Sequence, residues 1–275
     1  MLMVNLGCGG TWHADWLNLD ALPRSSQVQP CDVRNGIPLA SSSCDVVYHS
    51  HLLEHLERSA GERLMKECHR VLKPEGICRV AVPDLERIVR AYVQALDSAP
   101  MEADSFEYEW AMIELYDQTV RQMPGGEMGL AMRTATPEQR RHVESRVGPP
   151  PTVTAAAKQA RLQRFTRERL LAAASRRSTL AKHWLEESVL RLVGGQESRD
   201  ELRLGRFSHS GEIHYWMYDR YSLSRLFQRV GFHEIKVCSA NESLIPLFET
   251  FCLEVLDGRV RKPDSLFVES LRPAV

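Results

Sequence analysis

The chain has 275 residues, of which 43 % are hydrophobic and 26 % are charged, a composition typical of globular proteins. Its formal net charge of −1 gives no indication of a polyanionic partner, so any such indication has to come from local patches. No uninterrupted apolar stretch approaches the roughly 20 residues that span a bilayer. Seven dispersed cysteines without a Cys-x-x-Cys pair, and an N-terminus that enters a strand directly, predict reduced thiols in a cytoplasmic protein.

Short β-like runs alternate with helical patterns over residues 1–97. The predicted strands are Leu2–Leu6, Trp16–Leu19, Val28–Cys31, Cys44–Tyr48 and Gly76–Val82. A helix is predicted between the last two, in "AGERLMKECHRVLKPEG", and we expect Pro74 and Gly76 to end it. This alternation predicts a mostly parallel sheet with helices on its faces.

The β pattern disappears from about Ser98 to Ser210. Apolar side chains follow helical spacing in "FEYEWAMIELYDQTVRQM", then "PGGEMG" breaks the pattern, and a long helical segment is predicted over Ala155–Val193. We therefore predict an all-helical insertion or cap at 98–210, and an α/β core formed by 1–97 and 211–275.

The sheet pattern returns after the insertion. "DRYSLSRLFQRVGF" predicts an amphipathic helix that Asp219 caps and Gly231 ends. "HEIKVCSA" and "DSLFVESLR" predict the two final strands.

A glycine turn follows the first predicted strand, in "VNLGCGGTWHADWLNLD". Glycines let backbone N–H groups approach a ligand closely, because no Cβ stands in the way. A dinucleotide site needs a third glycine and an acidic residue about 20 positions further on. Here Trp12 occupies the third glycine position and Asp20 comes too early, and the GxxxxGK[ST] phosphate loop is absent. Neither phosphate-binding interpretation is therefore supported.

Four stretches follow one another in the chain: "NLGCGG", "CDV", "CDVVYHSHLLEHL" and "ECHRVLKPEGICRVAVPD". Together they resemble the class I S-adenosylmethionine-dependent methyltransferases, in particular the type 11 group, over about 1–97 and 211–240. The resemblance implies a Rossmann-like seven-stranded sheet, S-adenosyl-L-methionine as cofactor, and methyl transfer to an acceptor oxygen or nitrogen. The segment between the glycine turn and Asp20 is shorter than in the family, so any helix there must be very short.

The resemblance also implies a cofactor site at the carboxyl ends of four parallel strands. The turn would hold the methionine carboxylate, and Asp20 would accept hydrogen bonds from both ribose hydroxyls. Asp32 would accept one from the adenine amino group, with Val33 against the ring, and the fourth strand would end beside the sulfonium. The cofactor residues implied in this way are Asn5, Gly7, Cys8, Gly9, Gly10, Asp20, Asp32, Val33, His49 and Ser50.

The segment "HSHLLEHLE" is a dense cluster of ionisable side chains. Deprotonation makes an acceptor hydroxyl or amine a stronger nucleophile, and histidine has a suitable pKa for accepting that proton. We predict His51, just past the strand end, as the general base, with His55 as another residue that has a role in the site. In the alternative interpretation His51 is a pocket wall and His55 is a buried, hydrogen-bonded residue.

His51, Glu54 and His55 also match the H-x-x-E-H spacing of one class of zinc proteases. The further carboxylate ligands that such a site requires are not evident, and the Leu-Glu-His run also occurs in metal-free members of the type 11 group. We therefore expect no metal, and a metal-dependent hydrolase is the less favoured alternative.

A second cluster, "SHSGEIHYWMYDRYS", mixes aromatic and polar side chains just before the last predicted helix. This mixture is typical of a lid or an acceptor pocket, and His214 in it is a further candidate for the base. The alternative is a packed aromatic junction between the insertion and the core.

Residues 158–182 are strongly basic, with Glu168 as their one acid. Such a run predicts a solvated helix face, or peripheral contact with an anionic surface or a phosphorylated glycan carrier. No nucleic-acid motif is present, so we expect no specific nucleic-acid partner. The resemblance favours a small-molecule or glycan acceptor with a reactive sugar hydroxyl. The alternative is a non-catalytic interaction module with a methyltransferase fold that acts through this basic insertion. The intact glycines, Asp20 and Asp32 argue against this alternative, because such a module would not need them.

Overall fold

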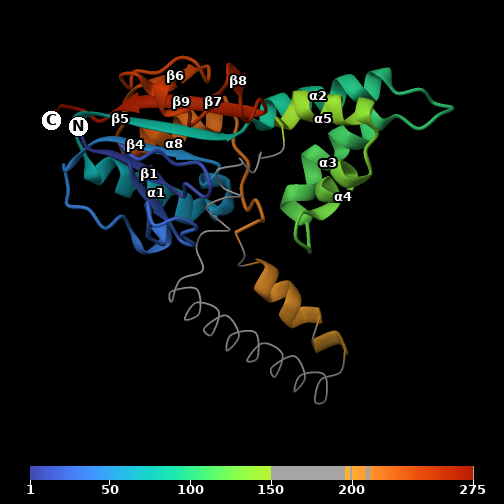
Figure 1. The fold of residues 1–275 in the computed structure, drawn as a ribbon, viewed down its shortest axis with the longest axis horizontal. Coiled ribbons are helices and arrows are strands. Elements are labelled where there is room, and N and C mark those ends of the chain that lie inside the picture. The colour runs from blue at the N-terminus through green and yellow to red at the C-terminus, as the bar shows by residue number, and fades with distance from the viewer. Residues whose placement is uncertain (150–195, 199, 209–210, 275) are drawn as a thin grey trace. The chain divides into compact units, whose positions relative to one another are not determined.

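The computed structural model describes residues 1–149, 196–198, 200–208 and 211–274 (Figure 1). The chain divides into two compact units. The first is formed by Met1–Arg121, Gly125–Gly148 and Ile213–Val275, and the second by Gln122–Pro124 and Pro149–Glu212. The helix predicted over 155–193 and the basic run 158–182 lie outside the described residues, and the core and insertion boundaries stay predictions.

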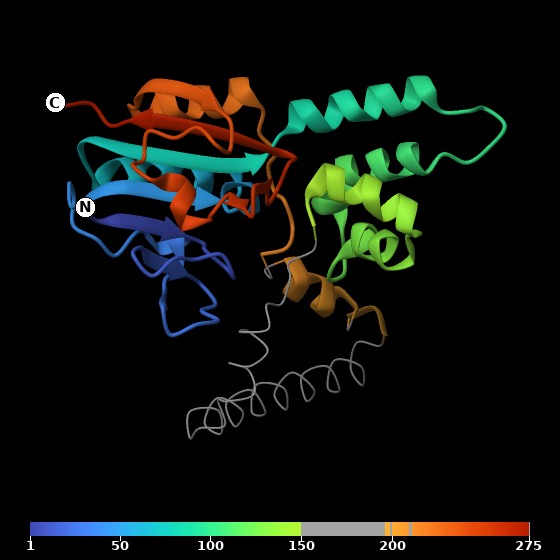
Figure 2. The same cartoon turned by 45° about the horizontal axis from the view of Figure 1, so that its top comes forward.

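A seven-stranded sheet forms the centre of the first unit, in the order β3-β2-β1-β4-β5-β9-β6 (Figure 2). Its strands are β1 (Met3–Leu6), β2 (Leu17–Asp20), β3 (Val28–Pro30), β4 (Cys44–Ser50), β5 (Leu72–Pro83), β6 (His233–Cys238) and β9 (Ser265–Leu271). The first five pair in parallel, and β9 lies antiparallel between β5 and β6. The predicted seven-stranded α/β sheet is therefore confirmed.

Helices and short turns complete the first unit. They are η1 (Val33–Asn35), η2 (Leu53–His55), α1 (Arg58–Val71), α2 (Leu85–Ser98), α3 (Phe106–Val120), α4 (Gly126–Thr134), α5 (Pro137–Val147), α8 (Arg220–Val230) and η3 (Phe248–Phe251), with a small hairpin of β7 (Val255–Leu256) and β8 (Arg259–Val260). Asp219 caps α8 and Gly231 ends it in a left-handed conformation, as predicted. Within the described ranges, no helix is both long enough and apolar enough to cross a membrane.

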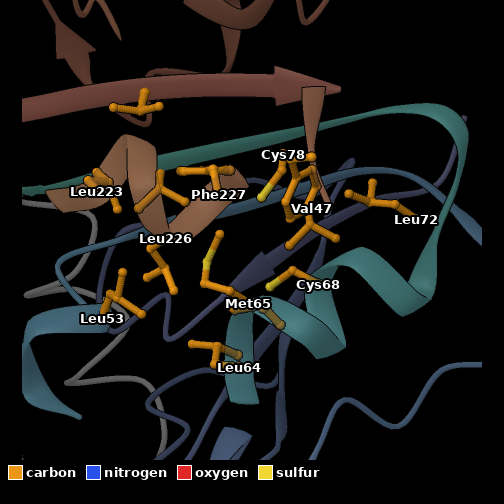
Figure 3. Close-up of a cluster of buried hydrophobic side chains, with 14 of the residues drawn as sticks. Val47, Leu53, Leu64, Met65, Cys68, Leu72, Cys78, Leu223, Leu226 and Phe227 are labelled. Atoms are coloured by element: carbon orange, nitrogen blue, oxygen red, sulfur yellow. The ribbon is translucent and has the colours of Figure 1, made fainter. Parts of the chain in front are cut away.

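The main core lies between the sheet and the pair of helices α1 and α8 (Figure 3). Apolar side chains at helical spacing from both helices meet alternate side chains of β4 and β5. The labelled members are Val47, Leu53, Leu64, Met65, Cys68, Leu72, Cys78, Leu223, Leu226 and Phe227. Burying one leucine or phenylalanine stabilises the fold by about 1.5–3 kcal/mol, so this packing holds the strands and their ends in place.

The boundary between α1 and β5 differs from the predicted one. The helix ends at Val71, and the strand begins at Leu72 and runs through Pro74 and Gly76. Leu72 pairs with β4, and the backbone of Gly76 accepts a hydrogen bond from Arg272 beside β9. These pairings with two neighbouring strands override the local turn signal.

Candidate functional site

The order of the sheet reverses between β1 and β4. From β1 the chain builds β2 and β3 on one side, and then β4 and β5 on the other. Open α/β sheets bind ligands outside the carboxyl ends of their strands at such a switch point. Leu6 pairs with His49 in this ladder, so the glycine turn after β1 and the histidine segment after β4 leave the sheet side by side.

The glycine turn follows β1 directly. Gly7 and Gly9 have φ values of +59° and +53°, in the left-handed region that favours glycine. A Cβ at Gly7 would lie 2.7 Å from Cδ1 of Leu52, whereas a Cβ at Gly9 or Gly10 would meet no atom within 4 Å. Gly7 therefore packs against the segment after β4, and the backbone of Gly9 and Gly10 is open to a ligand.

Asp20, at the end of β2, holds the glycine turn. The backbone N–H of Gly9 donates to Oδ2 of Asp20 at 2.8 Å, and that of Leu22 donates to Oδ1 at 2.8 Å. Each carboxylate oxygen keeps a further lone pair, so Asp20 can also accept hydrogen bonds from a ligand's hydroxyl groups. Sequence reasoning had predicted the ligand role and had missed the support of the turn.

Asp32 follows β3 and caps the short turn η1, which Val33 begins. Its carboxylate accepts hydrogen bonds from the backbone N–H of Arg34 at 3.0 Å and from the Arg34 guanidinium, whose Nη2 lies at 2.7 Å. These bonds hold the pKa of Asp32 below its ordinary value. Arg34 is thus a partner of Asp32 that the sequence prediction did not include, and its side chain occupies the carboxylate that the resemblance assigns to an adenine amino group.

Asn5 and Cys8 support the turn from inside. Nδ2 of Asn5 donates to the carbonyl of Thr11 and to Oδ1 of Asn18, both at 3.1 Å. Cys8 is buried, and burial raises the pKa of its thiol to about 11. Both side chains therefore shape the turn, and neither presents a charge there.

His49 and Ser50 end β4. Side chains alternate along a strand, so His49 shares the sheet face of Val47, which packs into the main core. The imidazole of His49 is fully buried, whereas Ser50 is partly exposed. The side chain of His49 therefore faces the core, and its backbone is the part that lines the carboxyl edge of the sheet.

His51 leaves β4 in a left-handed conformation with φ of +51°, which is uncommon for a residue with a Cβ. Its backbone N–H donates to the carbonyl of Ala81 at 2.8 Å. Nδ1 of His51 lies 3.2 Å from Oε1 of Glu54, and Nε2 lies 2.8 Å from Oγ of Ser265. Burial lowers the pKa of His51, so the imidazole is held neutral between a carboxylate and a hydroxyl.

Glu54 is the fully buried acid of this site. Neither of its carboxylate oxygens has a well-aligned hydrogen bond among the described residues. Burial opposes ionisation, but the neighbouring His51, His55 and His214 outweigh it and lower the pKa of Glu54 to about 2. The sequence had pointed to Glu54 solely as part of a metal motif, and in the structure it lies in a short 3-10 turn before α1.

His55 and His214 come from separate segments and meet beside Glu54. Nδ1 of His55 lies 3.1 Å from the carbonyl of Ile213, and the two imidazole rings are 4.7 Å apart in an edge-to-face arrangement. The backbone N–H of Tyr215 donates to the carbonyl of Glu54 at 2.8 Å. Burial lowers the pKa of His214 to about 3. The structure thus gathers all three histidines predicted for the site around one carboxylate.

A separate cavity of about 200 Å³ lies beside the first residue of α1 and along α8. Arginine and aromatic side chains dominate its lining, among them Arg58, Trp216, Tyr218, Arg225 and Arg229. The guanidinium of Arg58 lies over the Trp216 ring, 5.0 Å from its centroid. The cavity does not include the glycine turn, so it is distinct from the predicted cofactor site.

Comparison with known proteins gives a family match for the N-terminal part of the chain. Residues 4–80 match the family model described as a methyltransferase domain. No curated protein matches the chain. Among solved structures, an S-adenosylmethionine-dependent methyltransferase from Archaeoglobus fulgidus is 9% identical, with a TM-score of 0.39, over 98% of this chain and 85% of that chain. A possible histamine N-methyltransferase from Thermotoga maritima is 11% identical, with a TM-score of 0.38, over 98% of this chain and 82% of that chain.

The matched residues contain the glycine turn, both strand-end aspartates and the histidine segment, in the order that the sequence motifs predicted. In the structure these features lie along the carboxyl ends of β1, β2, β3 and β4, around the switch point of the sheet. The open backbone at Gly9 and Gly10 and the free lone pairs of Asp20 fit an amino-acid and a ribose group. Residues 4–80 therefore have the pattern of a methyltransferase domain, and S-adenosyl-L-methionine is the cofactor that this match implies.

Proposed function

We propose that this enzyme methylates an oxygen or nitrogen of a small-molecule or glycan acceptor, with a sugar hydroxyl as the leading acceptor. Bound S-adenosyl-L-methionine supplies a methyl group on a sulfonium, ready for in-line displacement. The glycan assignment is supported by the motif resemblance alone. A cytoplasmic location, supported by seven unpaired cysteines, belongs to the same proposal.

The cofactor-binding part of the proposal assigns one role to each strand end. The N–H group of Gly10 would bind the methionine carboxylate, because no side chain blocks its approach, while the N–H group of Gly9 holds Asp20. Asp20 would accept the ribose hydroxyls with the lone pairs that Gly9 and Leu22 leave free. Asp32 and Val33 would bind adenine after the Arg34 side chain moves from the carboxylate.

The contact between His51 and Ser265 is the observation that carries the catalytic part. A neutral imidazole with its proton on Nδ1, the nitrogen that faces Glu54, presents Nε2 as a proton acceptor, and Nε2 already lies 2.8 Å from a hydroxyl oxygen. During the reaction, the acceptor hydroxyl would take the position beside Nε2 of His51 that the Ser265 hydroxyl now occupies. His51 would then take the acceptor's proton, and Glu54 would stabilise the resulting imidazolium.

Calorimetric titration with S-adenosylhomocysteine tests the cofactor site without knowledge of the acceptor. We expect wild type to bind, NAD not to bind, and Asp20→Ala to weaken binding by more than about tenfold, the loss of one charge-assisted hydrogen bond. Asp15→Ala is the matched control. Asp15 lies in the connection between β1 and β2, and 70% of its side chain is exposed, so its removal should leave binding unchanged. Equal affinities of Asp20→Ala and wild type would contradict the assignment of Asp20.

A further inference from the structure

We propose that Glu54, His55 and His214 bind one divalent transition-metal ion, with Zn²⁺ as the representative ion. One carboxylate oxygen and one nitrogen from each imidazole lie within 4.8 Å of one another. Two histidines and one carboxylate are a ligand set that proteins use for zinc and for non-haem iron. This departs from the metal-free expectation, which weighed His51 as the third ligand and could not place His214.

The ligand atoms of Glu54 are unsatisfied in a buried place. The side chain of Glu54 is 0% exposed and His214 is 4% exposed. Both carboxylate oxygens of Glu54 lack a well-aligned hydrogen bond within the described part of the chain. A buried, ionised carboxylate in that state is costly, and a cation held between it and two imidazoles would compensate its charge. The lack of aligned hydrogen bonds to this buried carboxylate therefore points to a ligand.

Neighbouring backbone groups hold both histidines, and one of these groups orients the ring of His55 as a metal ligand requires. The carbonyl of Ile213, 3.1 Å from Nδ1 of His55, fixes the proton on that nitrogen. Nε2 of His55, 3.9 Å from Oε1 of Glu54, then keeps its lone pair for an ion. The backbone N–H of His214 donates to the carbonyl of Gln118 at 2.8 Å, which holds this residue in place. Such outer contacts are typical of built metal sites.

The proposed ion and the proposed base share one carboxylate. Glu54 can bind the ion through Oε2 while Oε1 faces Nδ1 of His51 at 3.2 Å. The ion would join the segment after β4 to the segment before α8, and three protein ligands leave a coordination position for water or an acceptor oxygen. The inference depends on these contacts alone and holds whichever acceptor is methylated.

The test uses the full chain, purified through an affinity tag that needs no metal and in buffers without a chelator. Mass spectrometry of the elements should find one transition-metal ion per chain. Metal-free protein is then titrated with ZnCl2 in competition with a chromophoric chelator. We expect His55→Ala and His214→Ala each to weaken zinc binding by at least roughly 10- to 100-fold, the loss known for supporting groups of such sites. His13→Ala, in a histidine that lies in the β1–β2 connection, is the matched control and should bind like wild type.

A purified protein without a bound ion, together with equal zinc affinities of wild type and His214→Ala, would overturn the proposal. Circular dichroism checks that each variant is folded. If His214→Ala does not fold, wild type loaded with Co²⁺ decides the question through its visible absorption. Intense bands of a four- or five-coordinate ion support the site, and the weak spectrum of the aqueous ion contradicts it.

Discussion

Three contacts hold His51, two at its imidazole and one at its backbone. Glu54 faces one ring nitrogen, Ser265 faces the other, and the backbone N–H of His51 bonds to Ala81. A left-handed conformation costs about 1–3 kcal/mol at a residue with a Cβ, and it persists only where surrounding contacts impose it. Strain of this kind is common at functional sites, which agrees with the proposed role of His51 as the base.

The first prediction concerns His51. We expect His51→Asn to keep the fold and the affinity for S-adenosylhomocysteine, because asparagine tolerates a positive φ. We expect turnover to fall by about 100- to 10,000-fold, the usual contribution of a general base. The measurement is methyl transfer from labelled S-adenosylmethionine to an acceptor found by screening sugars and glycans. Ser265→Ala, which keeps the imidazole, is the control, and comparable turnover of His51→Asn and wild type would exclude His51 as the base.

At the scale of elements, one side chain of α3 completes the first turn of α4. Gly125, before α4, has no side chain to cap the helix. Asp117 of α3 supplies the missing acceptor, because its Oδ1 accepts a hydrogen bond from the N–H of Glu127 at 2.7 Å. Its Oδ2 pairs with Nη2 of Arg121 at 2.6 Å. A buried, paired carboxylate therefore links two consecutive helices.

The second prediction compares two glycines of α4. A Cβ at Gly126 would overlap the carboxylate of Asp117, and the φ of Gly126 is +52°, so we expect Gly126→Ala to destabilise the protein by more than about 1 kcal/mol. At Gly129 the nearest atom to a new Cβ is the end of the Arg133 side chain, at 3.4 Å. We expect Gly129→Ala to stabilise by about 0.4–1 kcal/mol. Urea unfolding followed by circular dichroism measures both, and equal effects would contradict this account of α4.

The third prediction concerns Arg79 on β5, which is fully buried. Its guanidinium pairs with Glu254 and lies 2.7 Å from Oε1 of Glu269 on β9. Removal of the guanidinium leaves two buried carboxylates without their cation, so we expect Arg79→Ala to lower the free energy of unfolding by about 3–5 kcal/mol. Arg90→Ala, at an exposed pair on α2, should lower it by at most about 1 kcal/mol. A similar loss in both variants, measured by urea unfolding, would show that the Arg79 pairs do not stabilise the fold.

In the molecule as a whole, the order of the strands in the sheet sets the position of the cofactor site. The strands that carry the glycine turn, both aspartates and the histidine segment are β1 to β4, on both sides of the switch point. A ligand of this site binds the folded protein and not the unfolded chain, because the strand ends are brought together only by folding. Ligand binding and the stability of the first unit are therefore linked.

The fourth prediction follows from this linkage. S-adenosylhomocysteine at about 100 times its dissociation constant should raise the free energy of unfolding by about 2.7 kcal/mol and raise Tm with ligand concentration. At the same ligand concentration, Asp20→Ala should show a smaller rise. Differential scanning calorimetry over a range of ligand concentrations measures the effect. A Tm of wild type that does not respond to the ligand would contradict a cofactor site in this sheet.

The amino-acid sequence alone predicted the seven strands, the helices α1, α3 and α8, and the order of the motifs that match a methyltransferase domain. Apolar runs, helical spacing, Asp219 and Gly231 act locally, so they are readable without the fold. It predicted a helix end at Pro74 and Gly76 that is wrong, because strand pairing overrides a local turn signal. It also missed α2, although Asp84 is a recognisable cap whose carboxylate accepts from two N–H groups of the first turn.

Tertiary structure alone decided which side chains meet at the site. It turned the imidazole of His49 into the core, and it brought His214 to Glu54 and His55. These outcomes depend on contacts between segments far apart in the chain and on which side chains burial leaves without a partner. Local patterns carry no distance between such segments, and packing of the helices against the sheet sets that distance.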